Sequence, residues 1–215
     1  MNKDLRLSKV LQIVILAIIL ILISLNISQL RLLLLLIPVP FALIGTLSNL
    51  TNSIASLIII FLALAYMIKP IQAMDIFINS IVPGLIIGII AKKVIREKDS
   101  NKYEPIFMGS IVFIIAIIAY YFMYKYAFKI DILNEFLQIL DKGLESQKDV
   151  LKSAGNELLK SDTFRKIIPS VLFFRSMILS IIIYLIEIFL LRRMKYDDLS
   201  EIKFKNFYLP GNAIV

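Results

Sequence analysis

Six long apolar stretches constrain this chain more than any other feature of its sequence. They cover residues 10–25, 30–47, 54–68, 76–91, 106–126 and 167–191. A helix needs roughly 17 to 25 mainly apolar residues to cross the hydrocarbon core of a membrane, and in lipid every backbone polar group must be satisfied within the segment. The sequence therefore predicts an all-α fold, a polytopic transmembrane helical bundle of about six helices.

The composition indicates one membrane domain, which we assign to residues 1–195. Hydrophobic residues make up 59% of the chain and charged residues 19%, with a mean hydropathy of +0.85. The absence of Cys and His excludes thiolate nucleophiles, disulfides and the usual haem and zinc ligands. Ser110 and Ser180 are the serines that an intramembrane hydrolase would use, but helical spacing places no basic residue within their reach. We therefore expect no metal, no cofactor and no enzymatic activity.

The formal net charge of +8 comes from basic residues at the ends of apolar runs, not from one polar face. This pattern predicts the lipid bilayer as a partner and no binding to nucleic acid. Basic groups at residues 3–9, 92–102 and 192–195 all fall on the cytoplasmic side when the N-terminus is cytoplasmic, as the excess of Lys and Arg in short cytoplasmic loops requires. Residues 196–215 are then a cytoplasmic tail or the start of a further helix.

Two of the apolar runs contain residues that interrupt helices. Pro38 and Pro40 lie in the second run, and Pro83 and Gly84 lie in the fourth. Unwound backbone at membrane depth frees carbonyl and amide groups that bind ligands in a protected cavity, so these four residues are ligand-binding candidates; the alternative is that the prolines only kink their helices. The GxxxG spacing of Gly84 and Gly88 predicts close helix packing.

Arg175 and Glu187 are the charged residues that lie at least four residues from either end of an apolar run, and such residues are costly and often functional. They are twelve residues apart on one helix, which separates them by about 18 Å at 1.5 Å per residue. Each therefore needs its own partner. Arg175 either extends to the headgroups or binds a charged substrate group in a polar cavity, and Glu187 either reaches the inner interface, near Arg192, or lines the same kind of cavity.

The one long hydrophilic segment, residues 131–166, lies between the fifth and sixth helices. It repeats apolar or small residues at alternating spacings of four and three, which is typical of a helical heptad seam. The seam consists of Leu133, Leu137, Leu140, Leu144, Gln147, Leu151, Ala154 and Leu158. We expect an external amphipathic helix or hairpin on the rim of the bundle, and a substrate lid or a dimer contact remain alternatives.

Polar and aromatic residues gather where the helices meet the outer surface. Tyr120 and Tyr124 share a helix face and serve either as part of the interfacial aromatic belt or as a stacking surface for a ligand. Around the turn between the third and fourth helices lie Lys69, Gln72, Asp75 and Asn79. These residues form either a solvated loop or the rim of an outward-facing pocket.

Four motifs, in this order, resemble the YybS-like family of bacterial multi-pass membrane proteins. They are IPVPFALIG at 37–45, IVPGLIIGIIAKK at 81–93, IPSVLFFRSMILSIIIYLIEIFLLRRM at 168–194 and FKNFYLPGNAIV at 204–215. In that family the Leu-Pro pair near the end introduces further helices, so the resemblance implies that this sequence is truncated. The family is in turn distantly similar to the substrate-binding S components of energy-coupling-factor transporters. The resemblance therefore implies a bacterial cell-membrane protein.

Two functions follow from these observations. The first is a substrate-capture or transport-related membrane subunit that holds a small molecule between the broken helices and the sixth helix. The second is a scaffold that binds another membrane protein through helix–helix contacts, with either the heptad seam or the Gly84–Gly88 face as its surface.

Overall fold

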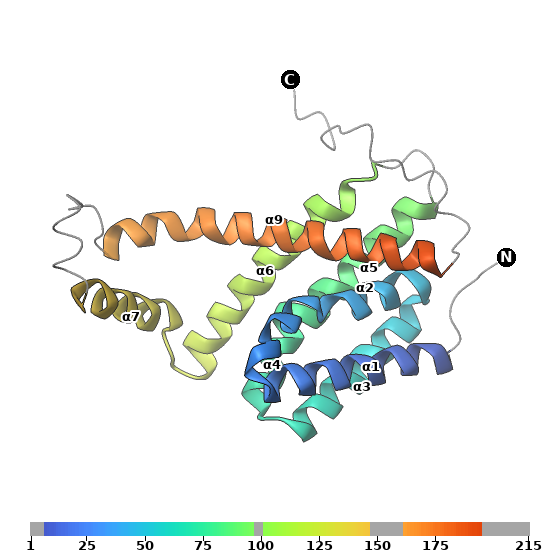
Figure 1. Cartoon of the computed structure of the whole chain (residues 1–215), viewed down its shortest axis with the longest axis horizontal. Coiled ribbons are helices and arrows are strands. Elements are labelled where there is room, and N and C mark those ends of the chain that lie inside the picture. Colours follow the sequence, from blue (N-terminus) through green and yellow to red (C-terminus); the bar gives the residue numbers. More distant parts are fainter. Residues whose placement is uncertain (1–6, 97–100, 147–160, 195–215) are drawn as a thin grey trace.

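Every element in the computed structural model, which describes residues 7–96, 101–146 and 161–194, is helical. This confirms the predicted all-α bundle. Five helices are long and apolar enough to cross a membrane, and a shorter apolar helix at 10–26 accompanies them. Figure 1 shows that the start of the first helix and the ends of the helices that close at Arg96 and Arg193 lie at one end of the molecule.

The second apolar run is divided into two helical pieces. In chain order the first elements are α1 (Leu7–Asn26), the 3₁₀ helix η1 (Ser28–Leu36), α2 (Pro38–Leu47) and α3 (Leu50–Met67). The change from 3₁₀ to α geometry falls at Ile37, directly before Pro38, which occupies the first turn of α2. Proline lacks an N–H and has a φ suited to a helix start, so Pro38 begins a new helix at the point where η1 ends.

The fourth apolar run is a continuous rod with one irregular turn. It consists of α4 (Pro70–Ile76), the π-helical turn η2 (Phe77–Ile81) and α5 (Val82–Arg96). The Val82 N–H donates to the Phe77 carbonyl, five residues back. Pro83 follows directly, and a proline inside a regular helix removes one hydrogen bond and clashes with the carbonyl four residues earlier. The wider π turn lets the chain continue past this proline without a break.

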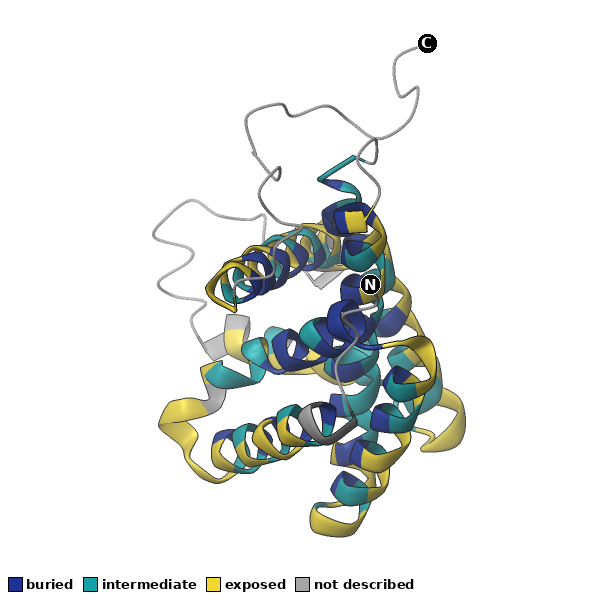
Figure 2. Ribbon diagram, turned by 90° about the vertical axis from the view of Figure 1, so that its right-hand side faces the viewer, coloured by how far each residue is buried: buried dark blue, intermediate teal, exposed yellow. Residues whose placement is uncertain are grey.

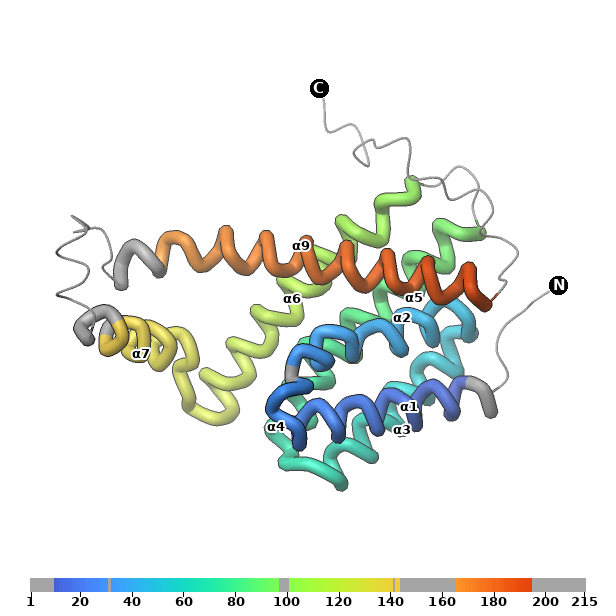
Figure 3. The backbone as a smooth tube through the Cα atoms, viewed as in Figure 1, coloured from blue at the N-terminus to red at the C-terminus, as the bar shows by residue number. Residues whose placement is uncertain are grey.

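The remaining elements are α6 (Glu104–Ala127), α7 (Ile132–Ser146) and α9 (Ser161–Arg193). With 33 residues, α9 is about 50 Å long, whereas the hydrocarbon core is about 30 Å thick. Its first turns and α7 therefore extend away from α1–α5, as Figures 1 and 3 show. Of the predicted heptad seam, Leu137 is buried and Leu133 and Leu140 are half-buried; the positions from 147 onward lie outside the described residues.

The closest helix crossing is that of α2 and α5, and glycines make it possible. A methyl group added at Gly88 would overlap the backbone of Ala42, one at Gly84 the backbone of Pro38, and one at Gly45 the backbone of Leu85. Small residues at such a crossing permit direct backbone contact. Figure 2 shows the buried positions gathered inside the bundle and the exposed positions on its outer faces, and many of the exposed residues are large and apolar.

We predict that Gly88→Ala destabilises the protein, although helix propensity alone favours alanine by up to about 1 kcal/mol. The added methyl group forces α2 and α5 apart, at an expected cost of about 1–3 kcal/mol. Thermal unfolding of detergent-solubilised protein, followed by circular dichroism, measures the change.

Gly143→Ala is the matched control, because a methyl group at Gly143 meets no atom of the described residues within 4 Å. This variant should be neutral or slightly stabilised. A Gly88→Ala protein that unfolds at the same temperature as the control would contradict the crossing described above.

Candidate functional site

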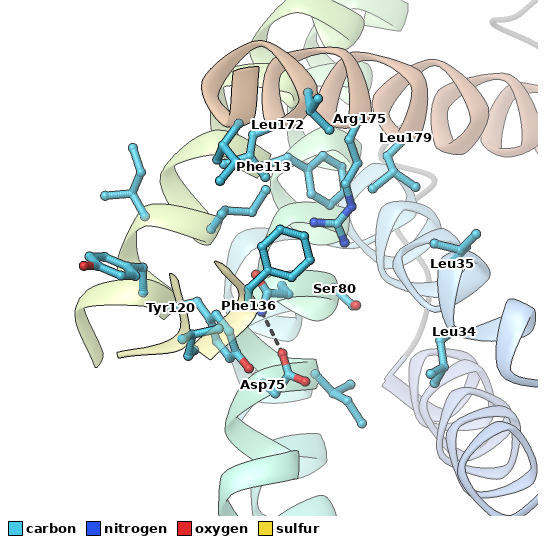
Figure 4. A pocket seen from close by; sticks show the side chains of 18 of the residues that line it. Leu34, Leu35, Asp75, Ser80, Phe113, Tyr120, Phe136, Leu172, Arg175 and Leu179 are labelled. Carbon is cyan, nitrogen blue, oxygen red and sulfur yellow. Dashed lines mark hydrogen bonds between the residues drawn. The ribbon is translucent and has the colours of Figure 1, made fainter. Parts of the chain in front are cut away.

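The principal cavity, of about 960 Å³, lies at the end of the bundle opposite the start of α1 and the ends of α5 and α9. Several parts of the chain border it: the junction of η1 and α2, the rod formed by α4 and η2, α6, α7, and the outer half of α9. The lining is mainly aliphatic and aromatic, and it includes Leu34, Leu35, Phe113, Phe136, Leu172 and Leu179 (Figure 4). A cavity of this size accommodates a small organic molecule.

The polar groups of the cavity come from different helices. Arg175 on α9 points into it from one side, and Asp75 on α4 points into it from another (Figure 4). One turn after Asp75, the Asn79 amide donates a hydrogen bond of 2.7 Å to Asp75 Oδ1. Residues four apart lie close together on a helix, and both Asp75 and Asn79 line the cavity.

Neither charge of the cavity is neutralised by an ion pair within the described residues. Arg175 has no salt bridge there, and the hydrogen bond from Asn79 is the one such bond to Asp75. The two side chains attract each other electrostatically across the cavity. Charges at membrane depth are costly unless they are paired, so this arrangement retains the capacity to bind a charged ligand.

A tight turn joins α6 and α7, and both of these helices contribute residues to the cavity lining. Lys129 has a positive φ of 57°, and the Ile130 N–H donates to the Tyr124 carbonyl at 3.0 Å. This is the left-handed conformation that commonly closes a helix. It reverses the chain, so that α7 contacts both α6 and α9 and Phe136 joins the cavity lining.

Glu187 does not line this cavity. It is fully buried, and Thr46 Oγ1 on α2 donates a hydrogen bond to its Oε1. The same hydroxyl lies 2.9 Å from the Gly88 carbonyl on α5, while Glu187 Oε2 has no hydrogen-bond partner among the described residues. Three helices therefore meet at one polar cluster inside an apolar core. Glu187 does not hold a group in the principal cavity.

The residues named from sequence are thus divided between two places. Pro38 and Arg175 line the cavity, together with Asp75, Asn79 and Tyr120 from the predicted outer rim. Pro40, Pro83 and Gly84 are buried and do not line it. The prolines therefore affect this region by changing the course of the helices. The interrupted backbone at Pro40, Pro83 and Gly84 does not line the cavity.

Other polar residues singled out from sequence serve packing or line a second groove. Ser180 Oγ and Ser110 Oγ both donate to the Ile106 carbonyl, at 2.8 Å and 2.7 Å, which joins α9 to α6. Lys69 and Gln72 line a separate groove of about 800 Å³. Phe136 and Leu133 were missed as cavity residues; their place in an amphipathic segment next to an aromatic cluster was the available signal.

The Thr46 cluster leads to a stability prediction. Thr46→Val preserves the shape of the side chain but removes the donor to Glu187, and it should lower the free energy of unfolding by about 1–3 kcal/mol because buried acceptors are left unsatisfied. Thr46→Ser keeps the hydroxyl and should lose less. Denaturation in detergent compares the two, and equal loss in both variants would count against a role for the hydrogen bonds.

Comparison with known proteins identifies a family. Residues 14–215 match a family model described as "Predicted membrane protein (DUF2232)". No curated protein and no solved structure matches the chain. The family description gives membrane location and no activity.

Proposed function

The chain belongs to the DUF2232 family of predicted membrane proteins, and we propose that it is a substrate-capture or transport-related membrane subunit. The observation that carries this proposal is the cavity of about 960 Å³, whose apolar walls surround a few polar groups. Small-molecule sites are typically concave, mainly apolar and provided with a small number of orienting polar groups. The cavity also lies beside the break between η1 and α2, which is a common setting for substrate sites in transporters.

The proposed membrane is the bacterial cell membrane, with the N-terminus in the cytoplasm. Support comes from the basic groups, because Lys93 and Arg96 end α5 and Arg192 and Arg193 end α9, at the same end of the molecule as the start of α1 (Figure 1). In this orientation the cavity lies in the half of the bundle that faces the extracytoplasmic side. An S-component-like role is the more specific form of this proposal.

The alternative role as a scaffold has less support. The Gly84–Gly88 face is filled by α2 of the same chain, so it is not offered to another protein. In the described part of the heptad seam, Leu137 is buried and Leu133 lines the cavity. The two surfaces predicted to bind another membrane protein therefore both contact other parts of this chain.

A ligand screen tests the proposed capture function. We expect at least one metabolite to raise the melting temperature of the detergent-solubilised protein, since a ligand that binds only the folded state stabilises it. Val171→Trp should abolish this shift, because Val171 lines the cavity and the indole would occupy it.

Ile178→Trp is the matched control. Ile178 lies on the same helix, has the same exposed fraction of 55% as Val171 and does not line the cavity. A screen without any stabilising compound, or a shift that survives Val171→Trp, would refute capture in this cavity.

The orientation is testable by labelling, because the natural chain has no cysteine and each introduced thiol is unique. Lys69 and Arg193 are both exposed and lie at opposite ends of the bundle. In intact cells a membrane-impermeant maleimide should react with Lys69→Cys, and it should react with Arg193→Cys only after the membrane is opened. The reverse pattern would place the cavity on the cytoplasmic side.

A further inference from the structure

The two charged side chains of the cavity differ in sign, come from different helices and do not neutralise each other by direct contact. Arg175 is on α9 and Asp75 is on α4, and Figure 4 shows both directed into the same space. No ion pair joins them within the described residues, although they attract each other at longer range. The space between them is therefore bounded by a cation on one side and an anion on the other.

The surroundings limit how each charge is satisfied. Asn79 donates to Asp75 Oδ1, which orients the carboxylate and leaves Oδ2 for another donor. Arg175 has five N–H donors in a planar fork suited to a carboxylate or phosphate. Apolar side chains such as Phe113, Phe136 and Leu172 line much of the remaining wall, which also includes the hydroxyl groups of Ser80, Tyr120 and Tyr121.

The charge arrangement discriminates between ligand classes. A ligand with only an anionic group would pair with Arg175 but would be repelled by Asp75. A ligand with only a cationic group would pair with Asp75 but would leave Arg175 unpaired and repelled. A zwitterion satisfies both side chains, and each charge-assisted hydrogen bond is stronger than a neutral one.

We propose that the cavity binds a small zwitterionic molecule with an aromatic or aliphatic body. Its anionic group pairs with Arg175, its ammonium group pairs with Asp75, and its body packs against the apolar wall that includes Phe113 and Phe136. This proposal rests on the proposed capture function and specifies the class of substrate.

Three indole compounds test the charge requirement at nearly constant shape. Tryptophan carries both charges, indole-3-propionate only the anion, and tryptamine only the cation. The chain contains no tryptophan, so the indole fluorescence comes from the probe alone, and its anisotropy rises as the bound fraction of the probe rises. We expect tryptophan to bind at least tenfold more tightly than either analogue, which corresponds to about 1.4 kcal/mol.

Variants assign each charge to its partner. Arg175→Gln should reduce tryptophan affinity to the level of tryptamine, and Asp75→Asn should reduce it to the level of indole-3-propionate. Arg193→Gln, a substitution on the same helix at the far end of the bundle, is the control and should leave the affinities unchanged. Circular dichroism melting curves verify that the three variants are folded.

Two results would overturn the charge requirement. One is indole-3-propionate or tryptamine binding as tightly as tryptophan, and the other is no binding of any probe at millimolar concentration. If a screened metabolite still stabilises the protein, and Val171→Trp still removes its effect, the zwitterion proposal fails while the capture function stands. If that metabolite effect is also missing, both fail.

Discussion

Direct backbone contact between α2 and α5 is the constraint on which the rest of the structure depends. Gly45, Gly84 and Gly88 bring the two helices so close that no side chain separates their main chains. In a bilayer, helix association is driven mainly by such packing and by hydrogen bonds between helices, since lipid is as apolar as the side chains. The close crossing also carries the Gly88 carbonyl to Thr46, and through Thr46 to Glu187 on α9. The crossing of α2 and α5 thus also helps to position α9.

The interruptions in the apolar runs place the cavity beside this crossing. Pro38 ends the 3₁₀ segment and starts α2, while the π turn before Pro83 contains Asn79, which lines the cavity together with Asp75 of α4. Neither interruption supplies backbone as the main lining. Each interruption changes the course of a helix, and side chains of these helices enclose the cavity. The αL residue Lys129 completes the enclosure by turning α7 back along α6 and α9.

The helices were predictable from sequence because apolar length and proline position are local properties, and the all-α bundle follows from them. Part of the cavity was predictable for the same reason, since Arg175 is conspicuous in an apolar run and Asp75 and Asn79 stand beside a turn. The distance between Arg175 and Glu187 along one helix predicted separate partners for them, but the partner of Glu187 was not predictable. It depends on which face of α9 meets α2, where Thr46 and Glu187 are 141 positions apart in the chain. The position of Phe136 in the cavity wall depends in turn on the positive φ of Lys129. Lysine rarely adopts this conformation, so the sequence gives no sign of it.

An unbroken helix connects the cavity to the buried cluster. Pro169 lies before Arg175 and Glu187 lies after it, so the eleven residues between the two charges contain no proline. Within that stretch Ser180 Oγ donates to the Ile106 carbonyl of α6, and Glu187 accepts a hydrogen bond from Thr46 of α2. The helix that carries the cation of the cavity is therefore attached to two neighbours, and a change in the tilt of α9 would alter the position of Arg175 and the contacts of Glu187 together.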